Sequence, residues 1–82
     1  MWGPSSKKLL RVLVLGAGVT DSVGEYARAR GYEVVNVDIC KGEGWDKGAD
    51  KSHIDIEADI LTWDYQRESR IVNIDMVWAS PP

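Results

Sequence analysis

Two short segments carry groups suited to binding a nucleoside. Gly16-Ala17-Gly18 follows an aliphatic run directly, and Asp38 comes 20 residues after Gly18, at the end of a second aliphatic run. Glycine permits a tight turn and lets the backbone approach a ligand without a Cβ in the way. A carboxylate at the end of the second strand can accept hydrogen bonds from both hydroxyl groups of a ribose. The pairing therefore predicts a site for an adenosine-containing ligand.

Asp21 distinguishes this turn from a dinucleotide site. A dinucleotide fingerprint has a third glycine where this chain has Asp21. A carboxylate there would repel a diphosphate at the N-terminus of the following helix, a place that normally favours anions. We therefore expect a ligand without phosphate, with a cationic or zwitterionic end. An NAD-binding domain stays open as an alternative.

Two further segments are candidates for contacts with a ligand or a substrate. Asp59 closes a short third strand, where its carboxylate could accept a hydrogen bond from an exocyclic amine such as that of adenine, or could cap the next turn. The sequence closes on Ser80-Pro81-Pro82. Proline fixes φ and lacks an N–H donor, so a diproline makes a rigid corner at a strand end. We interpret this corner as a substrate-positioning turn.

Three other residues have side chains that could bind a metal or react as a nucleophile. His53 and Asp55 give two metal-type ligands without a third, so we interpret His53 as an ordinary loop residue and expect no metal site. Cys40 is the single cysteine and cannot form an internal disulfide, which favours a reducing compartment. We interpret it as a partly buried side chain just past a strand.

The elements that position these residues follow from hydrophobic patterning. Residues 9–15 form a near-continuous aliphatic run, typical of a strand buried on both faces, and residues 32–39 form a second strand. Between them a helix is predicted from Thr20 or Asp21, closed by Gly31. Its helical spacing is carried by Val23, Tyr26, Ala27 and Arg30. This βαβ unit favours parallel strands with a right-handed crossover.

The second half of the chain is predicted with less regular structure. Residues 41–53 are rich in glycine and charge, which predicts an exposed loop with no buried group at its tip. A short third strand lies within residues 54–61, and residues 62–70 form a loop with one or two helical turns. Residues 71–79 give the fourth strand. We expect Trp63 to pack in the crossover and Trp78 to lie in the core.

Composition limits the remaining possibilities. Eighty-two residues allow one small domain with a thin core. Acidic residues outnumber basic ones by 13 to 10, so the chain has no general positive field that would attract a polyanion. No apolar run reaches the roughly 18 residues of a membrane span. We expect no membrane association and a cytoplasmic location, in the nucleoid or host cell interior rather than secreted.

Together these motifs resemble the amino-terminal half of an S-adenosylmethionine-dependent DNA methyltransferase. Residues 13–18 are similar to its cofactor motif, Asp38 to its ribose-binding acid, and Asp59-Ile60 to its adenine contact. Ser80-Pro81-Pro82 is similar to the start of its catalytic motif. Residues 75–82 are especially similar to phage and large-virus cytosine-C5 methyltransferases, in which a cysteine comes next. That cysteine would be the nucleophile, whereas an aromatic residue in its place would imply transfer to an exocyclic amine. In either case we expect this chain alone to be a truncated, inactive part of the enzyme.

The resemblance also implies a fold, a cofactor and partners. The implied fold is α/β, a Rossmann-like methyltransferase half-sheet with parallel strands in the order 3-2-1-4 and flanking helices. It would form one cofactor-binding half domain over residues 9–82, behind a flexible lead of residues 1–8. The cofactor would be S-adenosylmethionine. Its predicted contacts are Leu15, Gly16, Ala17, Gly18, Asp38, Ile39, Asp59 and Ile60.

The expected partners follow from the same half-sheet. DNA would be bound only through a missing carboxyl-terminal part. The strand Ile74–Ala79 would be an open edge, which predicts self-association or docking of a complementary chain. A non-catalytic nucleotide-binding or assembly module with the same half-sheet is the alternative function.

Overall fold

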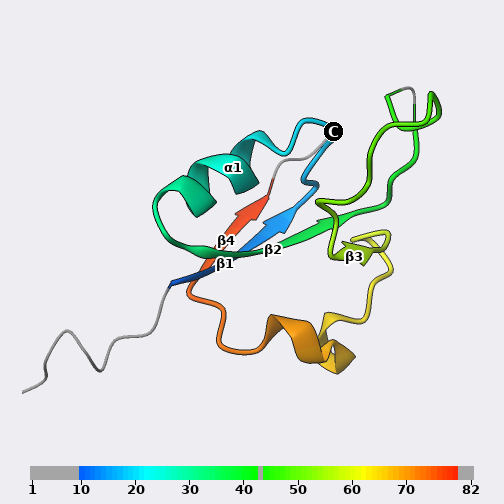
Figure 1. The fold of residues 1–82 in the computed structure, drawn as a ribbon. Helices are drawn as coiled ribbons and strands as arrows, with labels where there is room; N and C mark the ends of the chain where they lie inside the picture. Colours follow the sequence, from blue (N-terminus) through cyan, green and yellow to red (C-terminus); the bar gives the residue numbers. More distant parts are fainter. Residues whose placement is uncertain (1–9, 43, 80–82) are drawn as a thin grey trace, which may run out of the picture.

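The computed structural model describes residues 10–42 and 44–79 as a parallel sheet with a helix on one face (Figure 1). Helix α1 (Ser22–Ala29) connects the first two strands, and the strand order is β3-β2-β1-β4 with all pairs parallel. The strands are β1 (Arg11–Leu15), β2 (Glu33–Asp38), β3 (Ile56–Glu57) and β4 (Met76–Ala79). The predicted Rossmann-like half-sheet in the order 3-2-1-4 is confirmed.

Helix α1 begins and ends where the sequence predicted. Asp21 is its N-cap residue and Arg30 its C-cap residue. Gly31 follows with a φ of 82°, a left-handed conformation that glycine adopts without a Cβ penalty, and turns the chain into β2. The Asp21 side chain does not cap the helix, because its carboxylate is bound to other groups that form part of the site described below.

Alternate residues of β1 and β2 build a core on each face of the sheet. On the face of α1, Val12 and Val14 pack with Ala27 of the helix. The strand period of two directs the intervening side chains to the other face. The buried residues there are Leu13, Val35, Val37 and Ile56. Both central strands are therefore covered on both faces, as the aliphatic run of residues 9–15 predicted for β1.

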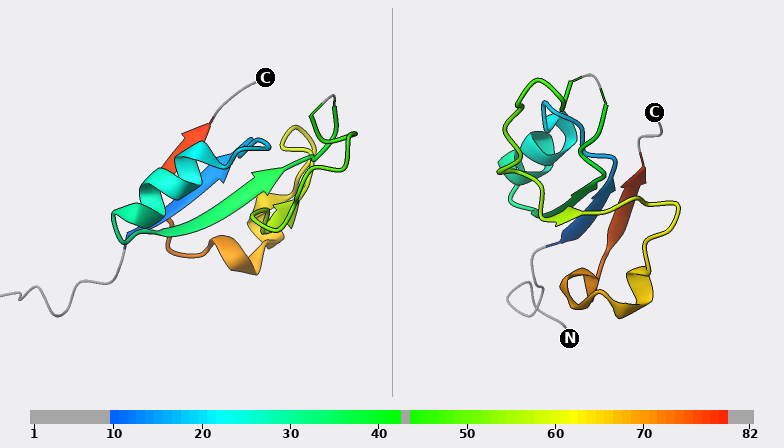
Figure 2. Two further views of the ribbon diagram at one scale, coloured as in Figure 1. Left: turned by 45° about the horizontal axis from the view of Figure 1, so that its top comes forward. Right: turned by 90° about the vertical axis from the view of Figure 1, so that its right-hand side faces the viewer.

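The crossover from β3 to β4 covers the face opposite α1 (Figure 2). It contains two single 3₁₀ turns, η2 (Tyr65–Arg67) and η3 (Ser69–Ile71), where one or two helical turns were expected. Trp63 packs against this core together with Ile71 and Ile74, as predicted for Trp63. A loop with short turns therefore covers the hydrophobic core on this face, as helix α1 covers it on the other face.

Strand β4 is shorter than the predicted 71–79. Its first residues are occupied by η3 and by contacts with Arg11, whose guanidinium donates to the carbonyl oxygens of Arg70 (2.9 Å) and Val72. The Arg11 N–H donates to Asp75 Oδ2 at 2.8 Å. The chain therefore curves around the start of β1 before it enters the sheet. The third strand is also short, with only two residues in the ladder.

The prediction that Trp78 lies in the core was wrong. Trp78 is 49% exposed, and Met76 and Val77 beside it are exposed to a similar degree. Strand β4 pairs with β1 on one side, and its other side is an edge of the sheet. An open groove of about 640 Å³ runs between β4 and α1, lined by the side chains of Tyr26, Met76 and Trp78 among others. Within the described ranges, no helix is long and apolar enough to cross a membrane.

Most residues of the segment after β2 lie in exposed turns, as predicted, but Trp45 is buried. Trp45 is only 8% exposed, and the backbone N–H groups of Trp45 and Asp46 both donate to the carbonyl of Gly42. The segment returns to the sheet where the Asp55 N–H donates to the carbonyl of Asn36 at 2.9 Å. This placement brings residues 44–55 close to the turn between β1 and α1.

Candidate cofactor site

The glycine turn joins the end of β1 to α1 and is tied to the end of β2. Gly16 and Gly18 have φ angles of 80° and 81°, which glycine adopts readily and other residues rarely do. The N–H groups of Gly16 and Ala17 donate to the carbonyl of Val37 at 2.8 and 3.2 Å. The Gly18 N–H donates to Asp38 Oδ2 at 2.8 Å. All three N–H groups of the turn therefore have partners on β2.

Asp38 ends β2 with a buried carboxylate whose position is fixed by two backbone donors. Its Oδ2 accepts from Gly18 and its Oδ1 accepts from the Cys40 N–H, each at 2.8 Å, and the residue is 8% exposed. A carboxylate has about four lone-pair sites, so each oxygen keeps one further site for a donor. None of the ion pairs among the described residues includes Asp38. The carboxylate therefore has acceptor capacity beyond its two backbone contacts.

Asp59 follows β3, the strand next to β2. The Ala58 N–H donates to the Asp38 carbonyl at 3.0 Å, so the two acidic residues follow adjacent strands at the same edge. Asp59 Oδ1 accepts from the Leu61 N–H at 3.0 Å, and its carbonyl accepts from Thr62 and Trp63. Asp59 Oδ1 therefore caps the turn that follows, and no hydrogen bond among the described residues uses Oδ2.

The remaining predicted cofactor residues are placed around this edge. Leu15 and Ile39 are half-buried at the ends of β1 and β2, and Ile60 is 39% exposed. Ser80, Pro81 and Pro82 lie outside the described residues. Ala79 pairs with Leu15, so β4 ends at the same edge of the sheet as the glycine turn.

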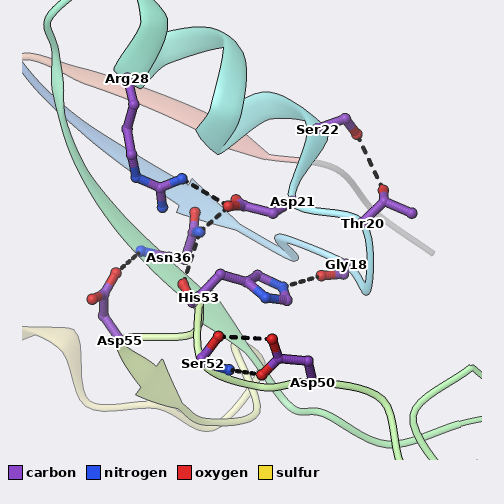
Figure 3. A network of polar contacts seen from close by, with 10 residues as sticks. All are labelled: Gly18, Thr20, Asp21, Ser22, Arg28, Asn36, Asp50, Ser52, His53 and Asp55. Atoms are coloured by element: carbon purple, nitrogen blue, oxygen red, sulfur yellow. Dashed lines mark hydrogen bonds and ion pairs between the residues drawn. The ribbon is translucent and has the colours of Figure 1, made fainter.

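Asp21 does not face the site as a free carboxylate. Its Oδ2 accepts from Arg28 Nη1 and its Oδ1 from Asn36 Nδ2, both at 2.7 Å, and the residue is 7% exposed (Figure 3). Asp21 has a φ of 54°, the left-handed region that a third fingerprint glycine would occupy easily. A Cβ on Gly24 would overlap Asp21 Oδ1, which explains a glycine inside α1. The expectation that Asp21 meets a cationic ligand is therefore not supported, because Arg28 already pairs with it.

Asn36 and His53 connect the segment after β2 to the glycine turn (Figure 3). Asn36 is fully buried in β2, and its Nδ2 donates to Asp21 Oδ1 and, at 3.0 Å, to the His53 carbonyl. His53 Nε2 lies 2.7 Å from the Gly18 carbonyl oxygen, and Trp45 stacks on the imidazole with ring centroids 5.8 Å apart. His53 was predicted to be an ordinary loop residue. The one signal in the sequence was Asn36, a polar residue inside an aliphatic strand.

Cys40 is buried directly behind Asp38. It is 5% exposed, and its Sγ lies 3.7 Å from the Asp38 carbonyl oxygen. Burial raises the pKa of the thiol above its ordinary value of 9.0, and the nearby carboxylates of Glu57 and Asp38 raise it further. The thiol is therefore protonated near neutral pH and inaccessible to a substrate. In the part of the chain that the structure describes, no three metal-ligating side chains come together.

The chain is similar in sequence to a known viral protein. The chain is 33% identical over 73 residues to a probable DNA (cytosine-5)-methyltransferase of Frog virus 3 (isolate Goorha). This similarity supports a cytosine-C5 methyltransferase relationship. The match covers 89% of this chain and 28% of the viral protein, so the chain spans little more than a quarter of that relative's length. No family model matches the chain, and no solved structure matches it.

The arrangement of the described residues is suited to binding a ligand. A fixed carboxylate, a glycine turn and a second acidic residue lie at the carboxyl ends of neighbouring parallel strands, where ligands bind in open α/β sheets. The one thiol is buried and protonated.

Proposed function

We propose that this chain is the amino-terminal S-adenosylmethionine-binding part of a DNA methyltransferase of the cytosine-C5 type. The observation that carries the proposal is the Asp38 carboxylate, held at the end of β2 by the N–H groups of Gly18 and Cys40. With one lone pair left on each oxygen, it can accept from two adjacent ribose hydroxyls without moving. The relationship to a viral cytosine-C5 methyltransferase supports the same cofactor.

The state of the turn favours a nucleoside without phosphates over NAD. A diphosphate is bound by free backbone N–H groups at the start of a helix. The N–H groups of residues 16–18 already donate to Val37 and Asp38, and the carboxylate of Asp21 stands at the start of α1. These three N–H groups are therefore not free to bind a diphosphate. The proposed adenine contacts are Ile39, Asp59 and Ile60, beside the ribose site.

The chain supplies the cofactor site and not the nucleophile. Transfer to cytosine C5 uses a thiolate that attacks the ring of a base turned out of the duplex. Cys40 is buried, and its raised pKa keeps it protonated. We propose that residues 80–82 form the turn that positions the substrate base, and that the 82 residues alone are inactive. DNA would be bound by a different part of the enzyme.

The open edge of β4 is the proposed attachment surface for that part. Met76, Val77 and Trp78 are each about half exposed, and Met76 and Trp78 line the groove beside α1. An unpaired parallel edge with apolar side chains on both faces recruits another strand. Nearly three-quarters of the viral relative lies outside the match, so the proposed occupant is a polypeptide that corresponds to that remainder. Self-association is the competing outcome.

Calorimetric titration with S-adenosylmethionine tests the cofactor assignment. Saturable binding is expected for the wild-type chain, with NAD failing to compete. Asp38→Asn should lose binding, whereas Asp46→Asn, an exposed aspartate of the segment after β2, should retain it. Circular dichroism of each variant confirms that it is folded at the titration temperature. Absence of binding in the wild type, or preference for NAD, would refute the proposal.

Sedimentation and a methylation assay test the attachment surface. A polypeptide corresponding to the remainder of the viral relative should co-sediment with the chain and restore methyl transfer to DNA. Val77→Lys should abolish both, whereas Val72→Lys, an exposed valine outside β4, should not. Complex formation without methyl transfer would favour the alternative, a non-catalytic assembly module. A dimer of the chain alone would favour self-association.

A further inference from the structure

The segment after β2 closes onto the glycine turn through one side chain. His53 reaches across 35 residues of sequence to the Gly18 carbonyl, with Nε2 and the oxygen 2.7 Å apart. A carbonyl oxygen only accepts, so Nε2 carries the proton and donates. Figure 3 shows the His53 imidazole directed at Gly18 in the glycine turn. This is a direct contact between residues 44–55 and the proposed cofactor turn.

Gly18 is thereby held at both of its peptide groups. Its N–H donates to Asp38 Oδ2 and its carbonyl accepts from His53. A residue with a φ of 81° and no side chain has access to many conformations when it is free. The two hydrogen bonds, one at its N–H and one at its carbonyl, favour one of these conformations. The carboxylate that the proposed function assigns to ribose and the imidazole of His53 therefore hold the same residue.

His53 is itself held against the sheet by several contacts. Its carbonyl accepts from Asn36 Nδ2 at 3.0 Å, and the Asn36 N–H donates to Asp55 Oδ2 at 2.7 Å. Asn36 lies in the ladder opposite Val14 of β1. The indole of Trp45 stacks on the imidazole at an interplanar angle of 23°. The backbone and the ring of His53 are both positioned by buried residues, so the side chain can transmit that order to the turn.

We propose that His53 is a positioning residue of the cofactor site, which holds the Gly18 carbonyl so that the glycine turn is formed before the cofactor binds. The proposal rests on the proposed function. A site that is ordered in advance avoids the entropic cost of ordering it on binding. Loss of the imidazole donor should therefore weaken cofactor binding, even though His53 acts through Gly18 and not by touching the cofactor itself.

Two substitutions separate the hydrogen bond from the rest of the side chain. His53→Gln keeps an N–H donor at about the distance of Nε2, and His53→Leu keeps bulk without a donor. Both lose the aromatic stack on Trp45, so the difference between them reports the bond to Gly18. Lys47→Ala, an exposed residue of the same segment, is the control. Calorimetric titration gives the affinity for S-adenosylmethionine, and NMR hydrogen exchange of the Gly18 amide reports the turn without ligand.

The expected result is an affinity about tenfold weaker in His53→Leu, the factor that corresponds to one lost hydrogen bond, and within about threefold of wild type in His53→Gln. Gly18 exchange should be faster in the leucine variant alone. Equal affinity of the leucine variant and the wild type would overturn the proposal. An equal loss of affinity in both variants would also overturn it, because a merely structural role of His53 would not depend on whether an N–H donor is kept.

Two other outcomes, a leucine variant that does not fold and a wild type that does not bind, are interpreted separately. If His53→Leu does not fold, the glutamine variant is compared with the wild type, and a folded glutamine variant with tenfold weaker affinity overturns the proposal. If the wild type itself does not bind S-adenosylmethionine, the proposed function fails, and the positioning role fails with it. That outcome differs from a wild type that binds and a leucine variant that binds equally well, which overturns the positioning role alone.

Discussion

Replacing Asp38 with asparagine should destabilise the fold before any ligand is considered. The Asp38 carboxylate accepts two backbone N–H groups at 2.8 Å while only 8% exposed. Asparagine has one acceptor oxygen, so its NH₂ group would face a second donor, either the Gly18 or the Cys40 N–H. One hydrogen bond to a charged group, about 1.5–3 kcal/mol, is lost, and a buried donor is left unpaired. We expect about 2–4 kcal/mol of destabilisation.

Urea unfolding followed by far-ultraviolet circular dichroism measures this loss. For a small domain with a slope of about 1 kcal/mol per molar urea, the midpoint should fall by at least about 2 M. Asp46→Asn, which changes an exposed aspartate, should stay within about 0.5 kcal/mol of wild type. If Asp38→Asn unfolds at the wild-type midpoint, the two N–H contacts do not hold the carboxylate, and the argument for a preset ribose acceptor fails. The binding experiment must therefore be run where this variant is still folded.

Three further predictions concern the glycines and the thiol. Gly18→Ala should destabilise by about 1–2 kcal/mol in urea unfolding, because its φ of 81° is strained for alanine although no atom crowds the added Cβ; an unchanged midpoint would contradict the left-handed turn. Gly24→Ala should cost about 1–3 kcal/mol by overlap with Asp21, and the same substitution in an Asp21→Ser background should cost less; additive effects in this double-mutant cycle would exclude the overlap. Because the folded state raises the pKa of Cys40, its contribution to stability is fully present below 9.0 and is lost as pH rises through the higher pKa of the folded state. Cys40→Ala should flatten the alkaline decline measured by thermal unfolding at a series of pH values, and a decline of equal slope in both proteins would contradict the assignment.

The parts of the fold that sequence reasoning predicted are those set by local patterns. Aliphatic runs place β1 and β2, and the glycines at 16, 18 and 31 mark turns whose φ angles are indeed positive. The length of β4 was not predictable in this way. Its start is set by Arg11, which is 64 residues from Asp75 in sequence and hydrogen-bonds to it in space. Patterns within a window of ten residues carry no information about such a contact.

The residues of the candidate site also separate into those that local patterns identify and those that they do not. Asp38 and the glycine turn were predicted because strand ends and their spacing identify them, and the structure joins them by a hydrogen bond. Trp45 and His53 were assigned to an exposed loop, since a segment rich in glycine and charge has no periodic pattern. Trp45 is buried and stacks on the half-buried His53, whose carbonyl accepts a hydrogen bond from Asn36 inside the sheet. Trp78 was assigned to the core because strand residues flanked by aliphatics are usually buried, yet it lies on an edge strand.

The contacts of the Asn36 amide limit which substitutions can be accepted at this position during evolution. One side chain serves the start of α1 through Asp21 and the segment after β2 through His53, while Asp21 in turn excludes any side chain at Gly24. A substitution at position 36 therefore orphans an acceptor in each of two distant segments at once. Sequences that descend from the same ancestor should exchange positions 21, 24 and 36 together, and an aliphatic residue at 36 should arrive with an uncharged residue at 21 and with glycine no longer required at 24.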